Sequence, residues 1–191
     1  MVEEKNPSRI LNMGFGFWPS KVLLTAVKMA LFTRLGDRSM TGEALGRELD
    51  LHPRGIWDFL DTLVALGFLE RSGVGQDALY SNTAETGSFL DKNKPGYIGG
   101  ILEMANDRLY RFWNDLETAL KTGQPQNEIR YSQKSMFETL YEDLPRLEQF
   151  MGAMRGISLG NFQVFAQKFD FSRYRSLCDV GGATGLLSTL V

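Results

Sequence analysis

The chain has 191 residues, enough for one large domain or two small ones, and its hydrophobic content of 43% supplies a sizeable core. The formal net charge of −2 argues against nucleic acid as a general partner. Residues 1–6 are charged, unlike a secretory signal, and charges or glycines interrupt the apolar runs well before the roughly 20 residues of a membrane span. We therefore expect a soluble cytoplasmic protein.

The first apolar segment, residues 10–18, is hydrophobic on all sides and contains two glycines. Such a segment needs apolar cover, and the expected partner is a second copy of the chain, giving a homodimer through the N-terminal helices. Residues 19–32 follow with apolar side chains at helical spacing behind a proline suited to a first turn. This stretch predicts one helix.

The next segment predicts two short helices and a hairpin. Thr41 is the expected N-cap of a helix that ends near Leu49, and Pro53 begins a second helix that Gly67 closes. The runs FLER and ALYS flank the glycine-bearing loop SGVGQD, as two strands would. Two helices followed by a hairpin are typical of a winged helix.

A winged helix has a second interpretation, a DNA-binding regulator, which the charges disfavour. Residues 43–77 carry seven acidic and three basic side chains, a net charge of −4. Asp58 and Asp61 lie on the helix that would enter the major groove, where contacts to phosphate need Lys or Arg. Dimerisation is the favoured use of the module, and DNA binding remains the alternative.

The middle of the chain predicts further helices. Residues 91–96 predict a boundary loop, and residues 98–120 have the broad apolar face of one long helix. A short helical turn is expected over residues 137–141. Asp143 is the expected cap of a last long helix, whose apolar positions extend to Phe165.

The chain closes on a predicted strand, residues 177–180, that meets the glycine cluster Gly181, Gly182 and Gly185. In open α/β sheets ligands bind where such a strand meets the following helix, and glycines let the backbone approach them. The cluster lacks a P-loop lysine and does not complete the dinucleotide pattern G-x-G-x-x-G. Cys178 is expected to be a small buried residue of this strand rather than a catalytic thiol. Taken alone, the cluster fits an ordinary strand–helix turn equally well.

The motif DVGGATG resembles the first S-adenosylmethionine-binding motif of class I methyltransferases. With LHPRGIWDFLDTLVALGFLE and FMGAM, in that order, the chain is similar to small-molecule O-methyltransferases of the plant caffeic-acid type and the bacterial polyketide-tailoring type. The resemblance implies a winged-helix dimerisation domain over residues 1–95, a helical connector with cleft helices over 96–172, and the start of a Rossmann-like domain over 173–191. The implied fold is mainly α with a small β-hairpin.

The resemblance also implies a cofactor site for S-adenosylmethionine. It would contain Asp179, Gly181, Gly182, Gly185 and Ser158, with Gly181 beneath the methionine part of the cofactor and Asp179 steadying the turn.

Substrate-binding residues follow from the same resemblance. Phe150 and Met154 would line the cleft, or else belong to the core, and Met104 and Asn106 would wall the acceptor pocket. The family usually has glycine at the position of Ala183.

The catalytic residues are expected outside these 191 residues. A βαβ unit needs roughly 30 residues or more, and only 16 run from Ser176 to Val191. The chain is therefore expected to be an inactive fragment of a longer enzyme, with the family's histidine base further along and no metal. The only histidine, His52, lies in a turn and is expected at the surface. The methyl acceptor is expected to be a small aromatic or polyketide-like hydroxyl compound. An interaction protein descended from such an enzyme remains a third interpretation.

Overall fold

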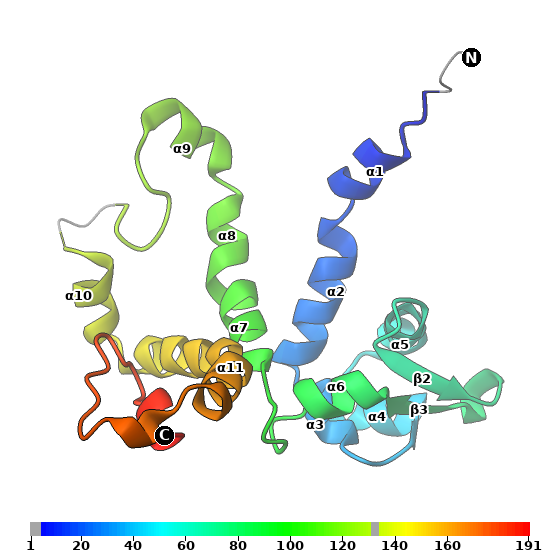
Figure 1. Ribbon diagram of the computed structural model, residues 1–191. Helices are drawn as coiled ribbons and strands as arrows, with labels where there is room; N and C mark the ends of the chain where they lie inside the picture. Colours follow the sequence, from blue (N-terminus) through cyan, green and yellow to red (C-terminus); the bar gives the residue numbers. More distant parts are fainter. Residues whose placement is uncertain (1–4, 131–133) are drawn as a thin grey trace. The chain divides into compact units, whose positions relative to one another are not determined.

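The computed structural model describes residues 5–130 and 134–191 (Figure 1). It divides the chain into two compact units, Met1–Thr86 and Gly87–Val191. The described residues are mainly helical with one small antiparallel sheet, which confirms the coarse fold expected from the sequence. No helix within the described ranges is long and apolar enough to cross a membrane.

Three helices begin the first unit: α1 (Ser8–Gly14), α2 (Phe17–Lys28) and α3 (Leu31–Leu35). The single helix predicted over residues 19–32 is therefore confirmed as far as Lys28 and wrong beyond it. Ala30 separates α2 from α3 because its backbone is left-handed, with φ of 55°, a conformation that costs a non-glycine residue roughly 1–2 kcal/mol. The break turns Phe32 and Leu35 into the core, where both are fully buried.

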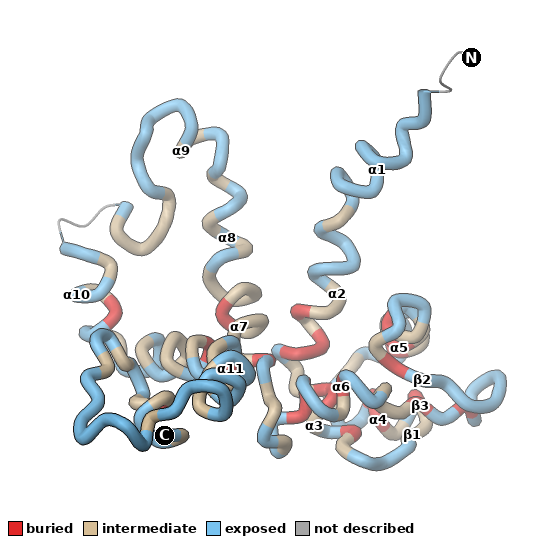
Figure 2. Tube along the Cα trace, viewed as in Figure 1, coloured by how far each residue is buried: buried red, intermediate tan, exposed pale blue. Residues whose placement is uncertain are grey.

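The rest of the unit consists of α4 (Gly42–Glu48), α5 (Pro53–Ala65), β1 (Met40–Thr41), β2 (Leu69–Ser72), the 3₁₀ turn η1 (Gly75–Asp77) and β3 (Leu79–Asn82). Strand β3 lies between β1 and β2 and pairs antiparallel with each. The hairpin β2–β3 was predicted, but the two-residue strand β1 was not. Buried residues gather where the helices meet this sheet (Figure 2).

The predicted caps of the first unit are confirmed. The Thr41 hydroxyl accepts the N–H of Ala44 at 3.2 Å, and Pro53 is the first residue of α5. Gly67 follows α5 with φ of 77°, and its N–H donates to the carbonyl of Val64 at 2.9 Å. Each cap satisfies backbone groups that have no partner inside the helix.

A buried tyrosine joins the sheet to α5. The Tyr80 hydroxyl donates to Asp61 Oδ1 at 2.7 Å, and Arg71 pairs with the same carboxylate at 3.2 Å. Burial, with the hydrogen bond and charge of Asp61, raises the pKa of Tyr80 to about 12. The hydroxyl therefore stays protonated and keeps donating at neutral pH.

Helix α6 (Ala84–Phe89) spans the junction between the units in sequence. The second unit then contains α7 (Gly99–Met104), the π-helical turn η2 (Ala105–Leu109), α8 (Tyr110–Trp113), α9 (Leu116–Thr122), α10 (Met136–Tyr141), α11 (Leu144–Lys168), and the 3₁₀ turns η3 (Phe171–Arg173) and η4 (Leu187–Thr189). The single helix predicted over residues 98–120 is confirmed from Gly99 to Trp113, where α7, η2 and α8 follow one another without a break, and is wrong beyond it, because α9 begins anew after Asp115. The predictions of α10 and of α11 with its cap Asp143 are confirmed: the Asp143 carboxylate accepts the N–H of Arg146 at 3.2 Å.

Helices α7 and α11 cross at close range through glycines. A Cβ on Gly100 would lie 3.1 Å from the backbone carbon of Gly152, and one on Gly156 would lie 3.2 Å from Cα of Ile98. Backbone atoms cannot rotate away as side chains can, so the glycines set the spacing of the two helices. This crossing fixes the position of α11, the longest helix among the described residues.

The end of the chain departs from the prediction. Residues 177–180 form no strand, and the described part of the second unit contains no other strand with which they could pair. A lone strand leaves its N–H and C=O groups without partners, so the segment stays irregular. The prediction that Cys178 is buried is wrong for the same reason, because its side chain is exposed.

Candidate functional site

A cavity of about 590 Å³ lies within the second unit, against α10, α11 and the glycine turn. Small-molecule sites typically measure roughly 300–1,000 Å³. Its lining consists of Phe137, Tyr141, Phe150, Met151, Met154, Arg155, Ser158, Phe162, Asp179, Val180, Gly181, Gly182, Ala183, Thr184 and Leu186. Aromatic and methionine side chains thus face a glycine-rich backbone turn.

Most of the residues singled out from the sequence meet in this cavity. The lining includes Phe150, Met154, Ser158, Asp179, Gly181 and Gly182. Gly185 lies outside the lining, but its N–H donates to the carbonyl of Gly182 at 2.7 Å and closes the turn.

Met104 and Asn106 do not line the cavity. Met104 is buried at the end of α7, and the Asn106 amide donates to Asp107 at 3.1 Å. The other oxygen of Asp107 accepts from Gln149 Nε2 at 2.9 Å. Since Gln149 precedes Phe150 on α11, this bond links the π-helical turn to the helix that lines the cavity.

The glycine turn combines an open face with a tight one. Gly181 has φ of 73°, and a Cβ added there would meet nothing within 4 Å. A Cβ on Gly182, in contrast, would lie 2.6 Å from the carboxyl carbon of Asp179, so the carboxylate packs directly against this glycine. Ala183 has φ of 47°, in the left-handed region that favours glycine. The open backbone at Gly181 fits a ligand that approaches the main chain closely.

The cavity also contains aromatic residues that sequence reasoning missed. Phe137 contacts Phe150 edge to face, with ring centroids 6.3 Å apart and planes at 84°, a favoured aromatic geometry. Tyr141 lies one helical turn beyond Phe137 on α10. The available signal was spacing, because residues 137 and 141 share a face of α10, as residues 151, 154, 158 and 162 do on α11.

A capping box fixes the start of α10. The backbone N–H of Ser135 donates to Glu138 Oε2 at 2.7 Å, and the Ser135 hydroxyl accepts the N–H of Glu138 at 3.3 Å. Hydrogen bonds from Ser135 to the Glu138 carboxylate, first from its backbone N–H and then from its side chain, lower the pKa of Glu138. The reciprocal pair holds the first turn of the helix and with it Phe137.

His52 has a structural role in the first unit. It is exposed, and its Nδ1 accepts the N–H of Arg54 at 3.2 Å as the N-cap of α5. Across residues 5–130 and 134–191, no group of three or more His, Cys, Asp or Glu side chains is placed to hold a metal ion.

Two family models match the chain. A model of the O-methyltransferase dimerisation domain matches residues 11–92, and a model of the O-methyltransferase domain matches residues 113–191. The chain therefore belongs to the O-methyltransferase family, as its motifs predicted.

Particular relatives support this assignment. The chain is 38% identical over 184 residues to the tetracenomycin polyketide synthesis 8-O-methyl transferase TcmO of Streptomyces glaucescens, covering 96% of this chain and 52% of that protein. It is 32% identical to the N,N-dimethyltransferase OxyT of Streptomyces rimosus, covering 95% and 52%. The chain spans about half the length of these curated relatives.

Solved structures share the fold. Human N-acetylserotonin methyltransferase in complex with SAM matches with a TM-score of 0.86 and 25% identity, over 100% of this chain and 56% of that one. PigF with SAH matches with a TM-score of 0.80 and 26% identity, over 97% and 54%.

Proposed function

We propose that the chain is the dimerisation and ligand-cavity part of an S-adenosylmethionine-dependent O-methyltransferase that methylates a hydroxyl of a small aromatic or polyketide-like molecule. The observation that carries this proposal is the cavity itself, in which the glycine turn faces the aromatic residues of α10 and α11. When bound, S-adenosylmethionine supplies an electrophilic methyl group. The residues proposed to hold it are Asp179, Gly181, Gly182 and Ser158, with Gly185 closing the turn.

The aromatic part of the cavity supports the acceptor class. Phe137, Phe150, Met154 and Phe162 form an apolar surface suited to a flat ring. TcmO is named for a polyketide, and another relative, from Streptomyces sahachiroi, for 3-hydroxy-5-methyl-1-naphthoate. OxyT is named as an N,N-dimethyltransferase, so a test of acceptors includes amines beside phenols.

The test of the cofactor site compares two glycines. Gly181 and Gly123 both have positive φ, 73° and 67°, and a Cβ at either meets nothing within 4 Å. Only Gly181 lines the cavity, whereas Gly123 ends α9. In the full-length protein encoded by this gene, Gly181→Ala should weaken binding of S-adenosylhomocysteine at least tenfold in calorimetry, and Gly123→Ala should leave it unchanged. Equal effects of the two substitutions would count against the site.

The test of activity uses radiolabelled methyl transfer. The full-length protein should methylate members of a panel of polycyclic phenols, and the 191-residue chain alone should not. Turnover by the 191-residue chain alone would refute the expectation that its catalytic residues lie elsewhere.

We further propose that the first unit forms a homodimer through α1 and α2. Six large apolar side chains there are exposed: Ile10, Leu11, Met13, Phe15, Phe17 and Trp18. Contiguous apolar surface of this kind marks an interaction site. Met13→Glu should shift the protein toward monomer in sedimentation experiments. Val74→Glu, at an equally exposed apolar position in the β2–β3 loop, should not, and a monomeric wild type at micromolar concentration would contradict the proposal.

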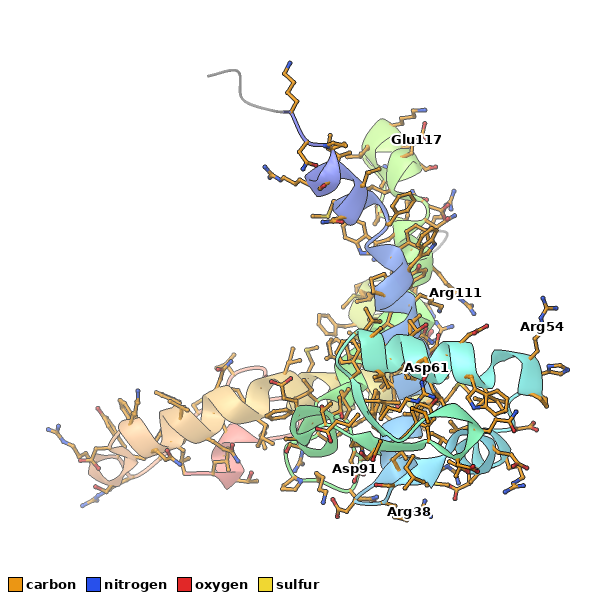
Figure 3. The ribbon with its side chains drawn as sticks, turned by 90° about the vertical axis from the view of Figure 1, so that its right-hand side faces the viewer. Arg38, Arg54, Asp61, Asp91, Arg111 and Glu117 are labelled. Atoms are coloured by element: carbon orange, nitrogen blue, oxygen red, sulfur yellow. The ribbon has the colours of Figure 1, made fainter. Side chains whose placement is uncertain are left out.

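The order of α4, α5 and the β2–β3 hairpin supports a winged helix used for dimerisation rather than DNA binding. Asp61 lies on α5, and Arg54 extends from the start of the same helix (Figure 3). Because Asp58 and Asp61 give this helix acidic groups, it is poorly suited to phosphate contacts. No gel shift with random duplex DNA at low salt is expected, and a shift would favour the regulator instead.

A further inference from the structure

Arg155 is the one basic residue among those that line the cavity. The face of α11 that lines the cavity carries Met151, Met154, Arg155, Ser158 and Phe162, spaced as neighbours on one side of a helix. The other four residues are apolar or carry a hydroxyl, so the guanidinium of Arg155 is the single charged group on this face of α11. Its guanidinium has five N–H donors and no acceptor, so an anionic ligand that enters the cavity is a suitable partner for it.

The structure provides no anion for Arg155 within residues 5–130 and 134–191. Several other basic residues of the second unit form ion pairs: Arg108 with Glu128, Lys121 with Glu117, and Arg146 with Asp143. Arg155 forms no such pair or hydrogen bond with a described residue. Asp179 is the one carboxylate among the lining residues, and no ion pair joins it to Arg155.

We propose that Arg155 binds a carboxylate group of a ligand held in this cavity. The guanidinium presents its donors in a planar fork that matches a carboxylate with two parallel hydrogen bonds. Two ligands would bring this group: the cofactor, through its amino-acid end, and an aromatic acid serving as methyl acceptor. Binding of the cofactor's carboxylate rests on the proposed function. Binding of an acceptor's carboxylate requires only the cavity and the positive charge of Arg155.

The experiment measures binding by calorimetry with two pairs of probes that differ only in the carboxylate. One pair is S-adenosylhomocysteine and its decarboxylated analogue, and the other is 3-hydroxy-2-naphthoate and its amide. The full-length protein is compared as wild type, Arg155→Gln and Arg155→Lys. Arg173→Gln is the matched control, because it removes one positive charge from η3, outside the cavity lining. Unfolding curves of all variants verify that each is folded.

The wild type should bind the acid about tenfold more tightly than its neutral counterpart in at least one pair. This factor is at the low end for a charge-assisted hydrogen bond because the Arg155 side chain is exposed. Arg155→Gln should abolish that preference without changing the affinity for the neutral probe. Arg155→Lys should keep part of it, and Arg173→Gln all of it. The pair that shows the preference identifies the source of the carboxylate.

Two results would overturn the inference: a wild type with no preference in either pair, or an Arg155→Gln variant that retains the full preference. Failure of the proposed function has a different signature, because the wild type would then bind neither adenosyl compound while the naphthoate pair still reports on Arg155.

Discussion

The glycine crossing of α7 and α11 permits a test with two variants of identical composition. Gly156 and Gly160 both lie inside α11, one turn apart. A Cβ at Gly156 would lie 3.2 Å from Cα of Ile98 and 3.3 Å from the carbonyl oxygen of Tyr97, whereas a Cβ at Gly160 meets nothing within 4 Å. Alanine at the two positions therefore differs only in what the methyl group touches.

The magnitudes follow from two opposing effects. Replacing glycine by alanine inside a helix stabilises it by about 0.8–1 kcal/mol, which Gly160→Ala should deliver almost in full. At Gly156 the same gain is opposed by overpacking against backbone, typically about 1–3 kcal/mol. We expect Gly156→Ala to be destabilised by about 1 kcal/mol and the two variants to differ by about 2 kcal/mol.

Urea unfolding of the 191-residue chain, followed by circular dichroism, measures this difference. With a slope of about 2 kcal/mol per molar urea, the midpoints of the two variants should lie about 1 M apart. A Gly156→Ala variant as stable as Gly160→Ala would refute the reasoning, because it would mean that α7 and α11 separate without cost.

Three further predictions concern single contacts. The free energy of unfolding should fall as pH rises from 10 to about 12. The pKa of Tyr80 is raised to about 12 in the folded state. Its contribution to stability is therefore complete below pH 10 and is lost as the hydroxyl deprotonates. Tyr80→Phe should flatten that part of a pH series of melts and cost about 1 kcal/mol at pH 7 by removing the bond to Asp61. Cys178 of the folded 191-residue chain should react with a thiol reagent at the rate of an exposed thiol, and protection until unfolding would contradict its exposure. Arg108 and Glu128 form an ion pair whose side chains are only 12% and 11% exposed. Arg108→Met should lower the free energy of unfolding by about 3–5 kcal/mol because it leaves Glu128 buried without its cation, and adding Glu128→Leu should restore most of that stability. A single variant as stable as the wild type would show that the pair contributes nothing.

The sequence by itself determined the local features of the molecule. Thr41, Gly67 and Asp143 cap helices through bonds to residues three positions away. Pro53 begins α5 because its fixed φ suits a first turn. Such features depend on short stretches of chain, which a sequence displays completely. The same holds for the family, since its motifs are contiguous runs of residues.

Tertiary structure decided where helices break and whether a strand forms. Ala30 accepts a left-handed backbone because the burial of Phe32 and Leu35 offsets that cost, and no local pattern records this exchange. Residues 177–180 have the composition of a strand, yet a strand depends on a neighbour for its hydrogen bonds, and the described part of the second unit supplies none. Local sequence preference thus indicated which segments could form a helix or a strand, and long-range contacts determined which of them did.

The cavity illustrates the same division. Phe150, Met154 and the glycine turn were found from motifs, whereas Phe137 and Arg155 were not, because their place in the lining depends on how α10, α11 and the turn meet. These segments are separated by many residues in the chain and are brought together by packing, including the close glycine crossing of α7 and α11. Distances between residues remote in sequence are set by the packed structure, and a single sequence does not contain them.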